Sequence, residues 1–186
     1  RTKGGEILSN DKFPDFKALT DYIHGLGLKF GIYSSPGATT CGGHVGSYQH
    51  EEIDARTWER WGVDYLKYDY CGYLDIEKDS KEETIQEPYI VMRNALDKVK
   101  RDIVFCVGYG APNVWNWAAE AGGNQWRTTR DITDEWNVVT AIGTFQDVCT
   151  DATAPGRNND PDMLVVLFRS HAGGWQIGAR LGKQGA

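Results

Sequence analysis

The sequence alternates short strand-like runs with amphipathic helical stretches, and this alternation limits the possible folds more than any other feature. The strand-like runs are rich in β-branched and aromatic residues and lie at residues 28–33, 63–69, 102–106, 125–127 and 163–166. The helical stretches that precede them lie at residues 16–26, 51–61, 87–100, 114–118 and 134–142. Strands that alternate with helices form a parallel sheet. Polar residues at the strand ends favour a (β/α)8 barrel of the TIM type, in which those ends share one mouth.

A doubly wound sheet is the alternative fold. No Gly-x-Gly-x-x-Gly motif follows any of the strand-like runs, which argues against a dinucleotide-binding version of that sheet. No linker or low-complexity segment divides the chain, so we expect one domain over residues 1–186. The chain starts at Arg1 without a Met or a signal peptide, and residues 182–186 have no strand or helix pattern. We therefore expect a fragment, a single partial barrel.

Composition excludes several partner classes. The net charge is −6 and no cluster of Lys and Arg is present, so we expect neither nucleic acid nor an anionic membrane as a partner. No apolar run reaches the roughly 18 residues of a membrane-spanning helix. The 7 Trp and 9 Tyr residues suit either a large core or a sugar-binding cleft, because their rings combine a flat apolar face with a polar tip.

Carboxylates follow several of the predicted strands, namely Asp69, Asp131, Asp160 and Asp162. Because parallel barrel strands all end at one mouth, we expect these side chains to converge. An Asp after a strand also serves as a helix N-cap, and this alternative stays open for each of them. Two carboxylates at a barrel mouth are typical of glycoside hydrolysis, in which one acts as nucleophile or base and the other as acid.

Two basic residues lie near these carboxylates in the sequence. Lys67 and Asp69 share one strand face, and the Lys charge favours the ionised form of Asp69, which suits a nucleophile. A buried structural ion pair is the alternative. Arg127 precedes Asp131 by four residues, and we expect its guanidinium to face Asp69, Asp131, Asp162 or a bound sugar. An acid such as Asp131 must hold its proton, so we expect burial or a neighbouring negative charge around it.

The four cysteines are Cys41, Cys71, Cys106 and Cys149. No Cys-x-x-Cys motif occurs and the four His residues do not cluster, so we expect no metal and no other cofactor. Cys41 lies in a long Gly-rich loop at residues 37–48, and Cys71 lies two residues after Asp69. From spacing alone, a disulfide and two free buried thiols both remain possible.

The sequence resembles glycoside hydrolase family 27, the α-galactosidases and α-N-acetylgalactosaminidases. Five stretches carry the resemblance in the family's order over residues 10–166: GLKFGIY at 27–33, TC and GSY at 40–41 and 46–48, WGVDYLKYDYC at 61–71, WRTT and DI at 126–129 and 131–132, and NDPDML at 159–164. Each stretch is weak alone, but five in order are specific.

The resemblance implies a retaining glycosidase that acts on terminal α-galactosyl residues of small or oligomeric substrates, with Asp69 as nucleophile and Asp131 as acid/base. It implies a disulfide between Cys41 and Cys71, and hence an oxidising compartment: secreted, periplasmic, lysosomal or vacuolar. It leaves Cys106 and Cys149 unpaired. Substrate contacts fall on Tyr33, Cys41, Lys67, Cys71, Tyr109, Arg127, Asp162 and Met163. Retention predicts about 5–5.5 Å between the two catalytic carboxyl groups. The oligomeric state cannot be inferred.

The sequence also departs from the family pattern. The family's first strands, with a Trp and a tandem Asp pair, would precede Arg1, and its last barrel units and C-terminal β-sandwich would follow residue 166. Arg130 stands where the family usually has a small residue, and Tyr109 follows a strand after which the family usually places a polar side chain. Two alternatives therefore stay open: a non-catalytic sugar-binding or inactive fragment, and a relative specific for β-L-arabinopyranosides or α-N-acetylgalactosaminides.

Overall fold

The structure is a computed structural model and describes residues 1–78, 81–162, 167–169 and 175–177. Its main sheet is parallel and has the strands β1 (Gly31–Ser34), β2 (Tyr65–Tyr68), β3 (Val104–Val107), β4 (Gln125–Arg127) and β5 (Asn158–Asp160). Between and before the strands run α1 (Phe16–Gly25), α2 (Glu51–Trp61), α3 (Glu82–Leu96), α4 (Val114–Trp117), α5 (Trp136–Phe145) and the 3₁₀ helix η1 (Gln146–Ala152).

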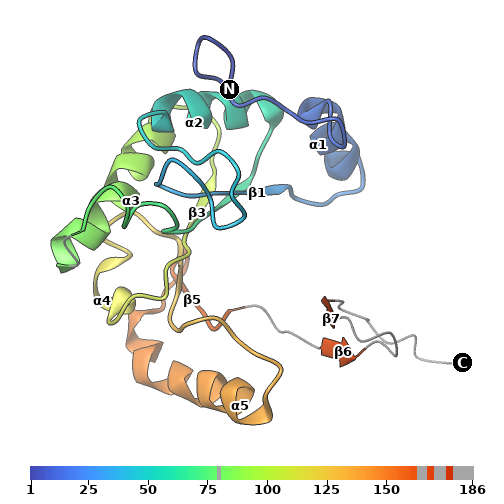
Figure 1. Cartoon of the computed structure of the whole chain (residues 1–186). Coiled ribbons are helices and arrows are strands. Elements are labelled where there is room, and N and C mark those ends of the chain that lie inside the picture. Colours follow the sequence, from blue (N-terminus) through green and yellow to red (C-terminus); the bar gives the residue numbers. More distant parts are fainter. Residues whose placement is uncertain (79–80, 163–166, 170–174, 178–186) are drawn as a thin grey trace, which may run out of the picture.

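The strand order in the sheet is β1-β2-β3-β4-β5, the same as the order in the chain. A doubly wound sheet reverses its order at a switch point, so that alternative does not apply to these strands. Figure 1 shows the helices in an arc outside the sheet. A sheet wound in one direction with its helices outside is what part of a (β/α) barrel looks like.

The two faces of the sheet differ in polarity because side chains alternate along each strand. Leu66, Phe105 and Trp126 point to the helical side and are fully buried in the main hydrophobic core. The opposite face carries Tyr33 and Lys67, which are paired in register on β1 and β2. This second face corresponds to a barrel interior and delivers polar side chains to the mouth.

An ion-pair cluster stabilises the end of the sheet opposite the mouth. Asp64, just before β2, is buried and lies 2.6 Å from Arg101 and 2.6 Å from His24, while the backbone N–H of Phe30 donates to its carboxylate. Burial alone would raise the pKa of Asp64, but these three partners outweigh it and hold that pKa well below its usual range. The cluster joins the segments that lead into β1, β2 and β3.

The sequence predicted most elements within a few residues. The bounds of α2 and β4 are as expected, and α2 ends at Trp61, where Gly62 with a φ of 85° caps the helix. The strand expected at 163–166 falls on residues outside those that the structure describes, and the fifth strand of the described sheet is β5, which we did not predict. Asn158 and Asn159 have low strand propensity, so the sequence did not indicate β5.

Two further differences concern α3 and the segment after β5. The helix expected at 87–100 is α3, which begins at Glu82 and ends at Leu96. Strands β6 (Leu167–Arg169) and β7 (Trp175–Ile177) pair antiparallel in a separate two-stranded sheet that we did not predict. Among the described residues, no helix is both long and apolar enough to span a membrane.

Candidate active site

A cavity of about 1110 Å³ opens where β2, β3 and β4 end. The segments after these strands supply its wall, and both Asp69 and Asp131 are lining residues. Carboxylates that are 62 residues apart in the sequence therefore face one space, as expected for strands that end at a common mouth. The separation of about 5–5.5 Å between their carboxyl groups stays a prediction.

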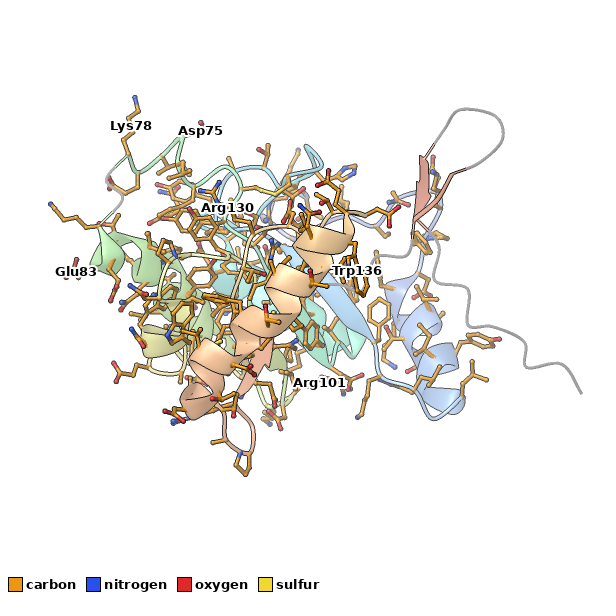
Figure 2. The ribbon with its side chains drawn as sticks, turned by 90° about the horizontal axis from the view of Figure 1, so that it is seen from below. Asp75, Lys78, Glu83, Arg101, Arg130 and Trp136 are labelled. Carbon is orange, nitrogen blue, oxygen red and sulfur yellow. A yellow bond between two sulfur atoms is a disulfide. The ribbon has the colours of Figure 1, made fainter. Side chains whose placement is uncertain are left out.

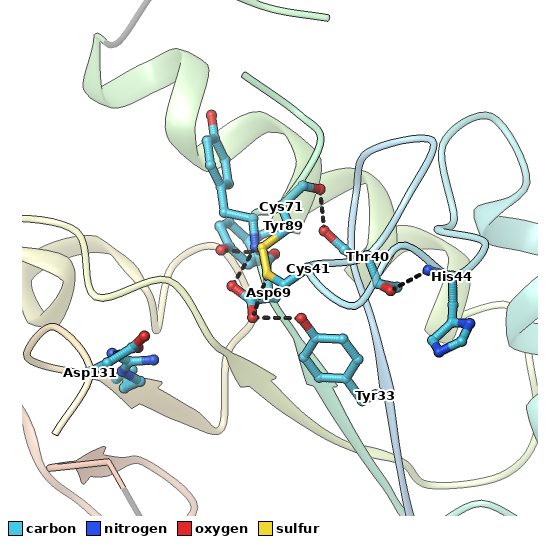
Figure 3. Close-up of a disulfide and its surroundings, with 11 residues drawn as sticks. Tyr33, Thr40, Cys41, His44, Asp69, Cys71, Tyr89 and Asp131 are labelled. Atoms are coloured by element: carbon cyan, nitrogen blue, oxygen red, sulfur yellow. Dashed lines mark hydrogen bonds and ion pairs between the residues drawn. A yellow bond between two sulfur atoms is a disulfide. The ribbon is translucent and has the colours of Figure 1, made fainter. Parts of the chain in front are cut away.

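Asp69 follows β2 directly and is held by hydrogen bonds to both carboxylate oxygens. The Tyr33 hydroxyl donates to Oδ2 at 2.7 Å, and the backbone N–H of Tyr70 donates to Oδ1 at 2.8 Å (Figure 3). Burial, followed by the hydrogen bond to Asp69, raises the pKa of Tyr33 well above its usual value, and the charge on Asp131 acts in the same direction. Tyr33 therefore remains a proton donor to the carboxylate. Sequence reasoning placed Tyr33 at the sugar and missed this contact, because the sequence alone does not define the register between β1 and β2.

The disulfide between Cys41 and Cys71 is present, with 5.1 Å between the Cα atoms, which confirms the expected pairing. The Sγ of Cys41 lies 3.5 Å from Oδ2 of Asp69, so the bridge forms part of the wall beside that carboxylate. Cys106 and Cys149 are free and buried, as expected. The three groups Cys41, Asp69 and Cys71 come within 4.8 Å of one another, but disulfide sulfurs carry no thiolate with which to bind a metal.

Glycines allow the two disulfide-bonded segments to approach. A Cβ on Gly37 would lie 2.3 Å from the backbone carbon of Gly72, and a Cβ on Gly46 would lie 2.1 Å from the carbonyl oxygen of Gly37. The Ser35 hydroxyl also donates to the carbonyl oxygen of Cys71. The Gly-rich loop after β1 is thus packed backbone to backbone against the turn that carries Asp69.

Arg127 is the last residue of β4 and joins two carboxylates. Its Nη2 lies 2.5 Å from Oδ1 of Asp131 and 3.8 Å from Oδ2 of Asp162, while its Nε donates to the carbonyl oxygen of Thr129 at 3.0 Å. The expectation that this guanidinium faces Asp131 or Asp162 is confirmed. The Asp131 side chain is 87% exposed, so the burial that we considered for it is absent.

Asp162 is buried, and its carboxylate accepts a hydrogen bond from the backbone N–H of Ile132 at 2.9 Å. Its φ of 78° lies in the left-handed region, which residues other than Gly seldom adopt. In this structure Asp162 therefore contacts the segment that carries Asp131, and it is not among the residues that line the cavity.

The remaining predicted residues differ in position. Tyr109 lines the cavity and stacks on Tyr70, with ring centroids 4.6 Å apart. Lys67 is half-buried on β2, beside Tyr33 and Cys106 in register, and is not a lining residue. No ion pair joins Lys67 to Asp69 in the described part of the chain. Met163 lies outside the described residues.

Sequence reasoning missed the far wall of the cavity, which consists of Leu74, Trp115, Phe145 and Val148. These residues belong to helices or loops whose apolar positions look like ordinary core positions, so the sequence carries little signal for them. Gly110 also lines the cavity, and its packing explains why a glycine stands there. A Cβ at this position would lie 2.0 Å from the carbonyl oxygen of Thr129, so the loops after β3 and β4 touch through their backbones.

Comparisons with known proteins agree with this architecture. The sequence model described as "Alpha galactosidase A" matches residues 1–171. An alpha-galactosidase of Cyamopsis tetragonoloba is 41% identical over 189 residues, which is 95% of this chain and 44% of that protein. The chain thus spans less than half the length of this curated relative.

Two solved structures of similar proteins have the same fold over most of the chain. Alpha-galactosidase I from Mortierella vinacea superposes with a TM-score of 0.73 and 36% identity, covering 80% of this chain and 42% of that one. An alpha-galactosidase from Saccharomyces cerevisiae, solved with raffinose, superposes with a TM-score of 0.79 and 26% identity. The match covers 87% of this chain and 41% of that one. On these matches, the chain belongs to the alpha galactosidase A family, glycoside hydrolase family 27.

Proposed function

We propose that the protein is a retaining glycoside hydrolase that removes terminal α-galactosyl residues from oligosaccharides or glycoconjugates. The observation that carries this proposal is the pair of carboxylates, Asp69 and Asp131, on the wall of one cavity in a chain of the alpha galactosidase A family. The names of the relatives support the choice of substrate class.

The reaction takes two steps, with one carboxylate in each role. In the first step Asp69 attacks the anomeric carbon, the bond to the leaving oxygen breaks, and Asp131 gives that oxygen its proton. In the second step Asp131 takes a proton from water, and the water oxygen displaces Asp69 and releases the sugar with its configuration retained. The chemistry uses only these groups and water, and needs no cofactor.

The hydrogen bonds at Asp69 suit a nucleophile. The hydroxyl of Tyr33 and the N–H of Tyr70 each donate to one carboxylate oxygen, and together they fix the orientation of the attacking group. On the acid/base side, the exposed Asp131 is anchored by the buried Arg127. Contacts to the galactose hydroxyls are assigned, as further proposals, to Lys67, Tyr109, Asp162 and Met163 together with Tyr33, Arg127 and the Cys41–Cys71 bridge.

The surrounding architecture and cellular location follow from the same proposal. The five strands form one side of a (β/α)8 barrel whose strand ends carry the site. A disulfide persists in oxidising compartments, so the protein acts outside the cell, in the periplasm, or in a lysosome or vacuole.

The test is hydrolysis of 4-nitrophenyl α-galactoside by the protein expressed from its complete gene. Wild type should release galactose, initially as the α-anomer by NMR. Asp69→Asn should lose turnover of activated and natural substrates alike, because no glycosyl-enzyme can form. Asp131→Asn should still form the covalent intermediate from substrates with good leaving groups, and mass spectrometry should detect it. An Asp69→Asn enzyme at full rate, or initial release of the β-anomer, contradicts the proposal.

A further inference from the structure

The main chain of Asp69 has two polar groups that need partners inside the fold. Its N–H donates to the carbonyl oxygen of Ser34 at 2.9 Å, which continues the parallel ladder between β1 and β2 by one residue. In such a ladder the carbonyl oxygen of Asp69 would next accept a hydrogen bond from the residue two positions after Ser34. That residue is Pro36, which has no N–H. The ladder therefore leaves the Asp69 carbonyl without its regular donor.

Tyr89 on α3 supplies a donor in its place. Its hydroxyl donates to the carbonyl oxygen of Asp69 at 3.3 Å (Figure 3). Tyr89 is fully buried and is not among the residues that line the cavity. The helix that carries it lies outside the sheet, and Figure 2 labels the exposed Glu83 in its first turn. The hydroxyl therefore reaches Asp69 from the core behind the site and not from the mouth.

Aromatic packing fixes the position of this hydroxyl. The Tyr89 ring packs edge to face on Tyr68, with ring centroids 6.0 Å apart, and it lies nearly parallel to the ring of Tyr70. Its other ring contacts are with Phe105 and Trp117. Side chains in such a close-packed core have little freedom to move. The hydrogen bond from Tyr89 therefore determines where the Asp69 carbonyl lies.

The same hydroxyl connects Asp69 to the turn after β3. Burial holds the pKa of Tyr89 well above its usual value, and the charge on Asp69 acts in the same direction. A hydrogen bond from the backbone N–H of Tyr109 to this hydroxyl acts in the opposite direction and is the smaller effect. Tyr89 thus stays protonated and remains a donor. One buried hydroxyl joins the turns that follow β2 and β3.

We propose that Tyr89 is a positioning residue for the nucleophile, because its hydroxyl replaces the N–H that Pro36 lacks and fixes the main chain of Asp69. Without that hydroxyl the peptide group after Asp69 is free to tilt, and the carboxylate moves with it. A small displacement of an attacking group lowers the rate strongly, since the reacting atoms must be aligned. This inference rests on the proposed function, in which Asp69 forms the bond to the sugar.

The experiment measures how fast Asp69 is labelled by 5-fluoro-α-D-galactopyranosyl fluoride. Asp69 attacks the anomeric carbon, the anomeric fluoride leaves as the bond forms, and the ring fluorine slows hydrolysis of the product, which mass spectrometry detects. In the protein from the complete gene, Tyr89→Phe should lower the saturating labelling rate by about tenfold. The reagent concentration at half-saturation should not change, because Tyr89 does not line the cavity. Loss of folded protein would instead lower the labelled fraction.

Pro36→Ala provides a rescue, because it restores an N–H at the ladder position. The double variant Pro36→Ala/Tyr89→Phe should label Asp69 within about threefold of the wild-type rate, and Pro36→Ala alone should match wild type. Tyr68→Phe is the matched control. Tyr68 is also fully buried and packs on Tyr89, but no hydrogen bond joins its hydroxyl to Asp69 in the described part of the chain. Tyr68→Phe should therefore keep the wild-type rate.

Three results would each overturn the positioning role: wild-type labelling by Tyr89→Phe, a double variant no faster than Tyr89→Phe, or equal slowing in Tyr68→Phe. If Tyr89→Phe does not fold, the double variant decides by the same limit of about threefold. A wild-type protein that is neither labelled nor active on 4-nitrophenyl α-galactoside overturns the proposed function, and the role of Tyr89 with it.

Discussion

The Arg127 side chain is only 8% exposed, whereas the side chain of Asp131, with which it forms an ion pair at 2.5 Å, is 87% exposed. The guanidinium thus reaches outward from the end of β4 and fixes an acidic group that would otherwise move freely in solvent. The second carboxylate near Arg127 is that of Asp162, which is buried, and its Oδ2 lies 3.8 Å from the Arg127 Nη2. One side chain therefore connects a solvent-exposed carboxylate to the interior of the fold.

Replacement of Arg127 should impair catalysis and stability together. In Arg127→Ala the Asp131 side chain loses its anchor, and a displacement of about 1 Å in such a group costs about 100-fold in kcat/KM. The buried carboxylate of Asp162 also loses its charged partner, which should lower the free energy of unfolding by about 3 kcal/mol. Steady-state kinetics and urea unfolding measure both effects. Arg157→Ala, at an exposed position, is the control and should change neither.

Asp162 should tolerate only residues that accept its backbone conformation. Asp162→Asn should fold, because Asn enters the left-handed region and can still accept the Ile132 N–H bond. Asp162→Val should lower the unfolding free energy by about 1–3 kcal/mol more than Asp162→Asn, since a β-branched residue is strained at a φ of 78°. Thermal and urea unfolding of the two variants, compared side by side, test this order. Equal stabilities would show that the backbone conformation carries no cost.

Removal of the disulfide should loosen the wall beside the nucleophile. The Cys41–Cys71 bridge spans a sequence separation of 30 residues, for which loop closure predicts about 3–4 kcal/mol of stabilisation. A Cys41→Ser/Cys71→Ser double variant should therefore unfold at lower urea concentration and lose activity, and dithiothreitol should do the same to wild type. Cys149→Ser removes a thiol that forms no disulfide and should keep the sensitivity to dithiothreitol. Activity that survives complete reduction would contradict the prediction.

Asp64 should make stability fall in acid. Its pKa is lowered in the folded protein by Phe30, His24 and Arg101, so the stability that it contributes is fully present above about pH 4, the pKa of an unfolded Asp. That contribution is lost as the pH falls below this value. Asp64→Asn should therefore be less stable than wild type at pH 6, and the gap should narrow steadily between pH 4 and pH 2. Urea unfolding across this range measures the gap, and a constant gap would refute the assignment.

The sequence predicted the parts of the fold that depend on local signals. Gly62 has the positive φ that ends a helix, so the end of α2 could be placed to the residue. The polar β5 has no such signal, because its pairing with β4 depends on tertiary context that single-sequence propensities do not contain. The same reason explains why the antiparallel pair of β6 and β7 was missed.

The candidate site was likewise predicted only in part from the sequence. The positions of Asp69 and Asp131 after strands were enough to expect them at one mouth, and both line one cavity. The bond from Tyr33 to Asp69 and the contact of Asp162 with Ile132 depend on side-chain direction across different segments, which spacing along the chain does not define. Asp162 does not line the described cavity, and its contact with the sugar stays a proposal.

Gly110 has a consequence for efforts to redesign this protein. A Cβ at position 110 would lie 2.0 Å from the carbonyl oxygen of Thr129, so any side chain there would push the neighbouring loop away. That loop continues into Arg130 and Asp131. Directed evolution of the loop after β3 would therefore disturb the proposed acid/base residue at the same time, so a substitution at position 110 should be tolerated only with compensating changes in residues 128–131.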